Sequence, residues 1–274
     1  MYRKDSIIIE EWLKRSDKAL LVTGARQIGK TWLIREEIAK SGYRKFEVNF
    51  IDQPDLVDYL NVKMSANEFL VKLKMIMPED CKPQETVVFF DEIQKCPEIV
   101  TKIKFLVEEG SFKYVMSGSL LGVELKGITS VPVGYLTVLR MYPMDFEEFL
   151  WAKGYTQEHI DDILRHMIEL KPFNETELNV YKALFLDYCV LGGMPDVIRG
   201  YIETGTFSGS TAVQEQIRLD YEEDVRKYAE GLDQAKIISV YRSVPSQLAK
   251  ENKKFQFNKI DKNARSREYT GCIE

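Results

Sequence analysis

The stretch Leu20–Trp32, LLVTGARQIGKTW, constrains the fold more than any other part of the sequence. An apolar run leads into Gly24–Thr31, which fits the Walker A (P-loop) pattern G-x-x-x-x-G-K-[ST]. Such a loop points successive backbone N–H groups at phosphate oxygens, and its glycines permit close approach. The pattern therefore predicts a buried strand over 19–23, a helix from Lys30 to about Lys40, and a nucleoside triphosphate as ligand.

The pattern also assigns roles to single residues. Lys30 is expected to reach the β- and γ-phosphates and to assist catalysis, and the Thr31 hydroxyl to ligate Mg²⁺. The residues predicted to bind the nucleotide are Gly24, Ala25, Arg26, Gln27, Ile28, Gly29, Lys30, Thr31 and Trp32.

An acidic pair follows the apolar run Val87–Phe90, which is typical of a strand buried on both faces. Asp91 is expected to hold Mg²⁺, directly or through water, as a Walker B aspartate. Glu92 is expected to orient the attacking water or take its proton. The alternative is a charged turn after a strand. Together with the loop at Gly24, the pair predicts ATP hydrolysis.

Two serines end another predicted strand, in VMSGS. Ser117 and Ser119 are both candidates for a catalytic polar residue that touches the γ-phosphate or the water. The alternative is a plain turn, because serine and glycine are common turn residues.

The pattern of elements divides the chain. Strands are predicted over 19–23, 43–50, 86–90, 112–119 and 135–142. A helix at 10–16 leads into the first strand, and helices at 30–40, 66–76 and 97–109 lie between strands. This alternation predicts a parallel sheet flanked by helices. After Tyr142 only helices are predicted, over 145–153, 157–170, 175–188, 195–203, 211–230 and 233–248, with a break at 205–209. The expected domains are 1–152 (nucleotide-binding), 153–232 (helical lid) and 233–274.

Composition excludes several classes of protein. The net charge of -5 does not indicate a dedicated nucleic-acid binder. No window approaches the roughly 18 apolar residues of a membrane helix, and the apolar run Ile7–Ile9 is too short for a signal peptide. The four cysteines are scattered without a CxxC pair. We therefore expect a cytoplasmic protein without membrane contact.

Six stretches together resemble one family: LLVTGARQIGKTWLI, VVFFDEIQKCPEIVTKIKFLVEEG, YVMSGSLLG, MYPMDFEEFLWAKG, YCVLGGMPDVI and SVPSQLAKENKKFQF. The chain resembles the AAA-type P-loop ATPases of bacteria and archaea that carry a C-terminal domain of unknown function. The resemblance implies a five-stranded sheet, with the strand before Ser117 between the two nucleotide-binding strands. It also implies a helical lid containing Gly192–Pro195, followed by a winged-helix-like segment. That segment is expected to be incomplete, because the sequence stops at Glu274.

One position departs from the family. Many relatives have an arginine after a glycine in the text that here reads VPVGYLTVLR, where Tyr135 follows Gly134. Arg26, Arg140 and Arg226 are candidate substitutes for a charge-neutralising arginine, and a partner protein is another source.

Three functions remain open at this stage. The first is an Mg²⁺-dependent ATPase that acts as a switch or remodeller on a protein client, with self-association as a further expectation. The second is a nucleotide-gated binding module with negligible turnover. The third is a DNA-binding regulator with an ancillary ATPase, which would make weak DNA contact through the basic tail at Lys253, Lys254 and Lys259. The alternative for that tail is a solvated wing packed on the lid.

Overall fold

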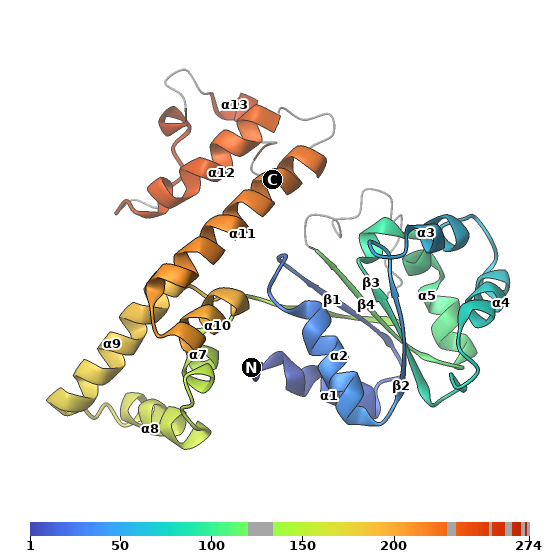
Figure 1. Ribbon diagram of the computed structural model, residues 1–274, viewed down its shortest axis with the longest axis horizontal. Helices are drawn as coiled ribbons and strands as arrows, with labels where there is room; N and C mark the ends of the chain where they lie inside the picture. Colours follow the sequence, from blue (N-terminus) through green and yellow to red (C-terminus); the bar gives the residue numbers. More distant parts are fainter. Residues whose placement is uncertain (120–133, 229–233, 252–253, 261–264, 270–271, 273–274) are drawn as a thin grey trace. The chain divides into compact units, whose positions relative to one another are not determined.

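The computed structural model describes residues 1–119, 134–228, 234–251, 254–260, 265–269 and 272. They divide into two compact units, residues 1–210 and 211–274 (Figure 1). The predicted boundaries at 152 and 232 do not coincide with this division, so the three-domain scheme stays a prediction.

The first unit begins with an α/β region. Its elements are α1 (Asp5–Arg15), β1 (Ala19–Gly24), α2 (Lys30–Ser41), β2 (Arg44–Asn49), α3 (Pro54–Leu60), α4 (Ala66–Ile76), β3 (Thr86–Asp91), the 3-10 turn η1 (Ile93–Lys95), α5 (Glu98–Glu109), β4 (Lys113–Ser119) and β5 (Leu136–Arg140).

The five strands form one parallel sheet in the order β2-β3-β4-β1-β5. The predicted α/β fold is confirmed. The strand that carries Ser117 lies between β1 and β3, as the resemblance implied. Because all strands are parallel, their carboxyl ends lie at one edge, and Gly24, Asp91 and Ser119 end their strands there. The predicted site residues at the ends of these strands therefore lie along one edge of the sheet.

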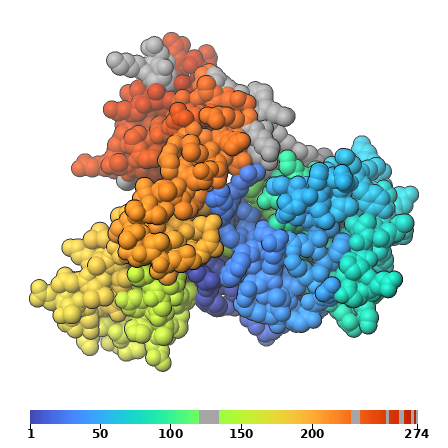
Figure 2. Space-filling view, in the orientation of Figure 1, coloured from blue at the N-terminus to red at the C-terminus, as the bar shows by residue number. Residues whose placement is uncertain are grey.

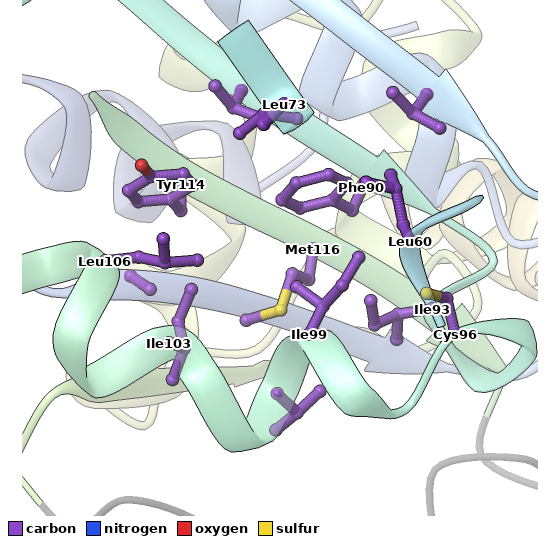
Figure 3. Packing of buried hydrophobic residues seen from close by; sticks show 14 of the residues in the cluster. Leu60, Leu73, Phe90, Ile93, Cys96, Ile99, Ile103, Leu106, Tyr114 and Met116 are labelled. Carbon is purple, nitrogen blue, oxygen red and sulfur yellow. The ribbon is translucent and has the colours of Figure 1, made fainter. Parts of the chain in front are cut away.

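Each face of the sheet is covered by a different set of helices. Alternate residues of the strands point to opposite faces. On one face, Phe90, Tyr114 and Met116 pack with buried residues of α3, α4 and α5 (Figure 3). On the other face, Leu20 and Phe89 pack with α1 and α2. Figure 2 shows the outer surface of these helices, from blue at α1 and α2 to cyan at α4.

A helical region completes the first unit. It contains α7 (Phe146–Ala152), α8 (Gln157–Ile168), α9 (Glu175–Leu191) and α10 (Pro195–Thr204). Asp145 and Asn174 cap α7 and α9, each in a reciprocal capping box. Phe146 packs edge-on against Phe185 at a ring distance of 5.3 Å, which joins the two helices.

The second unit contains the greater part of α11 (Phe207–Tyr228), then α12 (Gln234–Leu248), the 3-10 turn η2 (Phe257–Lys259) and α13 (Ser266–Tyr269). Within this unit, the buried carboxylate of Glu222 on α11 accepts hydrogen bonds from Arg242 on α12, at 2.7 and 2.8 Å, and from Arg218. These two guanidinium groups lower the pKa of Glu222 to about 2. The described residues of this unit contain no strand, so the predicted wing is not found among them.

Three helix predictions need correction. Helix α1 begins at Asp5 rather than at residue 10, because Ile9, Trp12 and Leu13 are buried together. Helix α3 was not predicted at all, although Pro54 stands at its first turn. Helix α11 begins at Phe207 and runs through the predicted break. In the described part of the chain, no helix is long and apolar enough to cross a membrane.

Candidate functional site

The loop between β1 and α2 takes a shape that its glycines permit. Gly24 has a φ of 153°, and a Cβ there would lie 2.3 Å from the Met141 carbonyl oxygen. Gly29 has a φ of 90° and precedes the first turn of α2. Both backbone conformations are rare for residues with side chains. The loop therefore turns tightly into the N-terminus of α2, where helix N–H groups favour an anion.

Lys30 lies folded against its own loop. Its ammonium donates hydrogen bonds to the carbonyl oxygens of Gly24, at 3.1 Å, and Ala25, at 2.6 Å. Burial lowers its pKa, while the nearby carboxylates of Glu92 and Asp91 act in the opposite direction. Within the described residues Lys30 forms no ion pair. Its cation is thus available to a phosphate that enters the loop.

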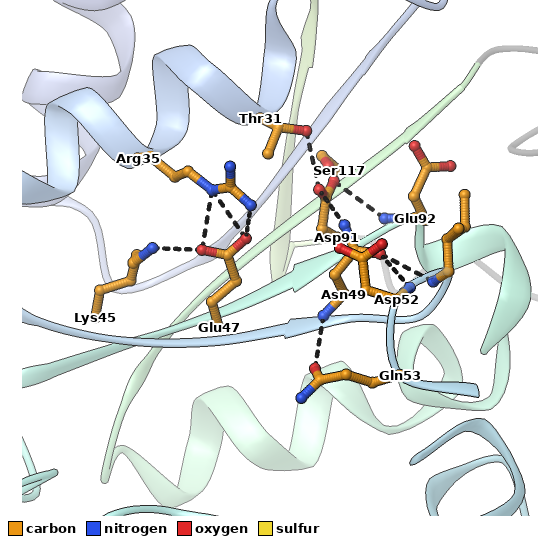
Figure 4. A network of polar contacts seen from close by, with 11 residues as sticks. Thr31, Arg35, Lys45, Glu47, Asn49, Asp52, Gln53, Asp91, Glu92 and Ser117 are labelled. Carbon is orange, nitrogen blue, oxygen red and sulfur yellow. Dashed lines mark hydrogen bonds and ion pairs between the residues drawn. The ribbon is translucent and has the colours of Figure 1, made fainter. Parts of the chain in front are cut away.

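Asp91 is the centre of a polar network at the carboxyl edge of the sheet (Figure 4). Its Oδ2 accepts hydrogen bonds from Thr31 Oγ1, at 2.9 Å, and Asn49 Nδ2, at 3.1 Å. Its Oδ1 accepts one from the Ser117 hydroxyl and one from the Glu92 backbone N–H. The carboxylate is buried, and it lies against the hydroxyl that was predicted to share a metal with it.

The structure separates the two candidate serines. Ser117 contacts Asp91 through its hydroxyl. Ser119 is level with Gly24 in the register of β4 and β1, beside the start of the loop. Both are buried, and neither lines the pocket described below. Of the two serines, Ser117 is therefore the one that hydrogen-bonds the acidic pair in the described part of the chain.

A pocket of about 590 Å³ opens at this edge, within the first unit. Of the predicted residues it contains Arg26, Gln27, Gly29, Lys30, Thr31, Trp32 and Glu92. Gly24, Ala25, Ile28 and Asp91 lie outside its lining. Basic residues that line it are Arg3, Arg26, Lys30, Arg35 and Arg199, against the acidic Glu92 and Asp196. The excess of positive charge suits a polyphosphate.

The helical region contributes to the pocket through α10. Pro195, Asp196 and Arg199 line it, although none of them was predicted as a site residue. Arg199 pairs with Asp196 at 2.9 Å. A usable signal was present in the sequence, because residues three and four apart share a face of a helix that Pro195 begins.

The Gly-Gly-Met-Pro segment explains how α10 reaches the pocket. A Cβ on Gly193 would lie 2.2 Å from the Met144 carbonyl oxygen, so only glycine fits there. The Met144 N–H donates a hydrogen bond to the Gly193 carbonyl at 2.7 Å. Since Pro195 follows two residues later, this close contact fixes the beginning of α10 beside the loop.

Arg3 is a second residue that the sequence did not reveal. It is buried, and its guanidinium donates to the carbonyl oxygens of Ile28, at 2.8 Å, and Tyr142, at 2.7 Å, and to Glu148 Oε1, at 3.0 Å. It thereby ties the loop to the segment after β5 and to α7. No local pattern marks Arg3, because Glu148 lies 145 residues away in the sequence.

The three candidate substitutes for the absent arginine lie in different places. Arg26 lines the pocket. Arg140 is exposed on β5 and is absent from the lining. Arg226 belongs to the second unit. The Tyr135 hydroxyl donates a hydrogen bond to Glu108 at 2.6 Å.

Two family profiles match parts of the chain. Residues 16–150 match the profile of an AAA domain, and residues 182–274 match that of a domain of unknown function. No curated protein matches the chain. Among solved structures, the Pif1 helicase from Candida albicans is 13% identical over 56% of this chain, with a TM-score of 0.36. The match covers 43% of that helicase chain, less than half of its length.

Proposed function

We propose that this chain, an AAA-type protein with a C-terminal domain of unknown function, binds ATP with Mg²⁺ and hydrolyses it to ADP and phosphate. The observation that carries the proposal is the hydrogen bond from Thr31 to Asp91, at 2.9 Å, beside a pocket lined by Lys30 and Glu92. It brings together a hydroxyl, a carboxylate, a cation and a second carboxylate from two separate stretches of sequence.

The residues present fit both groups. The backbone N–H groups of the loop and the Lys30 ammonium would hold the phosphates. Thr31 and Asp91 offer oxygen ligands, which Mg²⁺ prefers, and this ion commonly takes only one or two ligands from the protein. When bound, the ion neutralises phosphate charge. Glu92 would orient the attacking water, and Ser117 would hold Asp91.

A titration with ATP and Mg²⁺ tests the binding step. We expect Lys30→Ala to weaken ATP binding at least tenfold, because the phosphates lose their buried cation. Lys14→Ala is the matched control, since Lys14 is exposed on α1 and pairs only with Glu10 among the described residues. Equal affinities of wild type and Lys30→Ala would show that the loop is not the phosphate site.

Phosphate release tests the hydrolysis step. We expect Glu92→Gln to lower turnover about a hundredfold or more while ATP binding persists, since the amide cannot accept a proton from water. A wild-type protein that binds ATP without releasing phosphate would instead support the second function, a nucleotide-gated module. That alternative is favoured by Tyr135, which occupies the place of an arginine in many relatives and hydrogen-bonds Glu108.

The proposed role is that of a switch or remodeller, in which α10 responds to the nucleotide. It is supported by the position of Arg199 in the pocket wall. The protein client, self-association and a cytoplasmic location stay predictions. The DNA-binding alternative rests on the basic tail alone, where Lys254 and Lys259 are exposed and Lys253 lies outside the described residues.

A further inference from the structure

A glutamine contacts the second carboxylate of the acidic pair. Gln94 lies in η1, two residues after Glu92, and its Nε2 donates a hydrogen bond to Glu92 Oε2. This contact was not anticipated from the sequence, and it places a neutral donor on the group proposed to orient the attacking water.

The backbone at this point is strained. Glu92 has φ 58° and ψ 46°, the left-handed conformation that few residues other than glycine adopt. Such strain persists where surrounding contacts impose it, and it is common at functional sites. Here the turn is closed by hydrogen bonds from Lys95 N to the Glu92 carbonyl, at 3.0 Å, and from Cys96 N to the Ile93 carbonyl, at 2.9 Å. The backbone therefore keeps its shape without help from the Gln94 side chain.

The rest of the Gln94 amide contributes nothing to folding that the structure shows. Its Oε1 is buried and has no hydrogen-bond partner among the described residues. A buried acceptor without a partner is unfavourable, and an apolar side chain of the same length would avoid that loss. Among the described residues, the one hydrogen bond of the amide is thus the bond that it donates to Glu92.

We infer that Gln94 is a positioning residue that holds the Glu92 carboxylate in the orientation needed for hydrolysis. The inference rests on the proposed function. Because the amide acts through Glu92 and is absent from the pocket lining, it should affect turnover without affecting ATP binding.

The test compares ATP affinity and phosphate release in wild type, Gln94→Met and a matched control. Methionine keeps the length of the side chain and removes the donor. We expect turnover to fall about ten- to a hundredfold, since a small misplacement of a reacting group has effects of that size. Affinity for ATP should change by less than about twofold. Gln157→Met is the control, because Gln157 also donates to a carboxylate, Asp161 at 2.8 Å, on exposed α8.

A double variant separates positioning from a general structural role. If Gln94 acts through Glu92, then adding Gln94→Met to Glu92→Gln should lower the residual single-turnover rate by less than about twofold. A further tenfold loss would overturn the inference. So would an equal loss of ATP affinity, or of thermal stability, in Gln94→Met.

Gln94→Asn provides a second route should the methionine variant fold poorly. It retains a buried amide, which is too short to reach Glu92 in the same way, so turnover should fall here too. Wild-type turnover in Gln94→Asn would overturn the inference and leave the proposed function intact. If wild type itself releases no phosphate, both fail together.

Discussion

The phosphate loop and the Gly-Gly-Met-Pro segment use glycine for the same physical reason, on the same short stretch of backbone. Gly24 leaves room for the carbonyl of Met141, and Gly193 leaves room for the carbonyl of Met144. Hydrogen bonds of 2.7 Å reinforce both contacts, from Met141 N to the Thr23 carbonyl and from Met144 N to the Gly193 carbonyl. The segment 141–144 therefore holds the loop on one side and the start of α10 on the other.

The two motifs differ in the reason why glycine is required. In a loop of this pattern, the requirements of phosphate binding fix both the spacing and the residue types, so the pattern can be recognised in an unknown sequence. In Gly192–Pro195, the requirement comes from a contact with a distant part of this fold. Only a family resemblance pointed to that segment, and the place of Pro195 in the pocket wall emerged from the structure.

The largest effect is expected at Arg3, which ties the loop to Tyr142, in the segment that contacts both motifs, and to α7. Arg3→Met leaves the Glu148 carboxylate buried without its cation, which should lower the free energy of unfolding by about 3–5 kcal/mol. Chemical denaturation measures it. Adding Glu148→Gln should recover part of the loss, because the uncompensated charge is removed. A loss below about 1 kcal/mol in Arg3→Met would show that the pair does not stabilise the attachment of the loop to α7.

A methyl group at Gly24 should disrupt the packing of the loop against Met141 and weaken ATP binding. Gly24→Ala places Cβ against the Met141 backbone, and we expect ATP affinity to fall at least a hundredfold, or about 2.7 kcal/mol. Calorimetric titration measures it. Gly209→Ala is the control, since nothing lies within 4 Å of a Cβ there and the residue is helical. Unchanged binding in Gly24→Ala would contradict the tight packing of the loop.

The same change at Gly193 should have a smaller effect on ATP affinity. Gly193→Ala crowds Met144, and overpacking of this kind lowers the free energy of unfolding by about 1–3 kcal/mol. ATP affinity should fall about tenfold as the start of α10 shifts, because a tenfold change needs only about 1.4 kcal/mol. Gly200→Ala, with its nearest neighbour at 3.9 Å, should leave both unchanged. If Gly193→Ala and Gly200→Ala had equal stability and equal ATP affinity, the close contact at Gly193 would not be what positions α10.

The smallest expected effect is a pH dependence of stability that arises from Lys30 in the loop. Burial lowers the pKa of Lys30, so the unfolded chain binds this proton more tightly than the folded one. Between the folded pKa and the ordinary value of 10.5, the stability of the ligand-free protein should therefore gain a contribution as pH rises, while ATP affinity falls. Thermal melts of wild type and Lys30→Met between pH 8 and 10 would reveal this contribution. An identical dependence of melting temperature on pH in the two proteins would exclude it.

Much of the α/β region could be predicted because its strands are buried runs such as Val87–Phe90, bounded by turns and alternating with helices. The loop and the acidic pair were predicted because their chemistry requires particular residues in adjacent positions. Asn49 was missed, since only the register of β2 on β3 brings it level with Asp91. Arg3 and Gly193 were missed as contacts for the same reason. Each depends on a tertiary partner that no local spacing encodes.

We propose that the loop and α10 together form one nucleotide pocket, and an arginine exchange distinguishes this from a pocket formed by the loop alone. Arg199 and Arg165 each pair with an aspartate three residues earlier on an exposed helix surface, at 2.9 and 3.3 Å. Only Arg199 lines the pocket. In titrations with ATP and Mg²⁺, we expect Arg199→Met to weaken binding about tenfold and Arg165→Met to leave it unchanged. Wild-type affinity in both variants would contradict the claim that α10 forms part of the site.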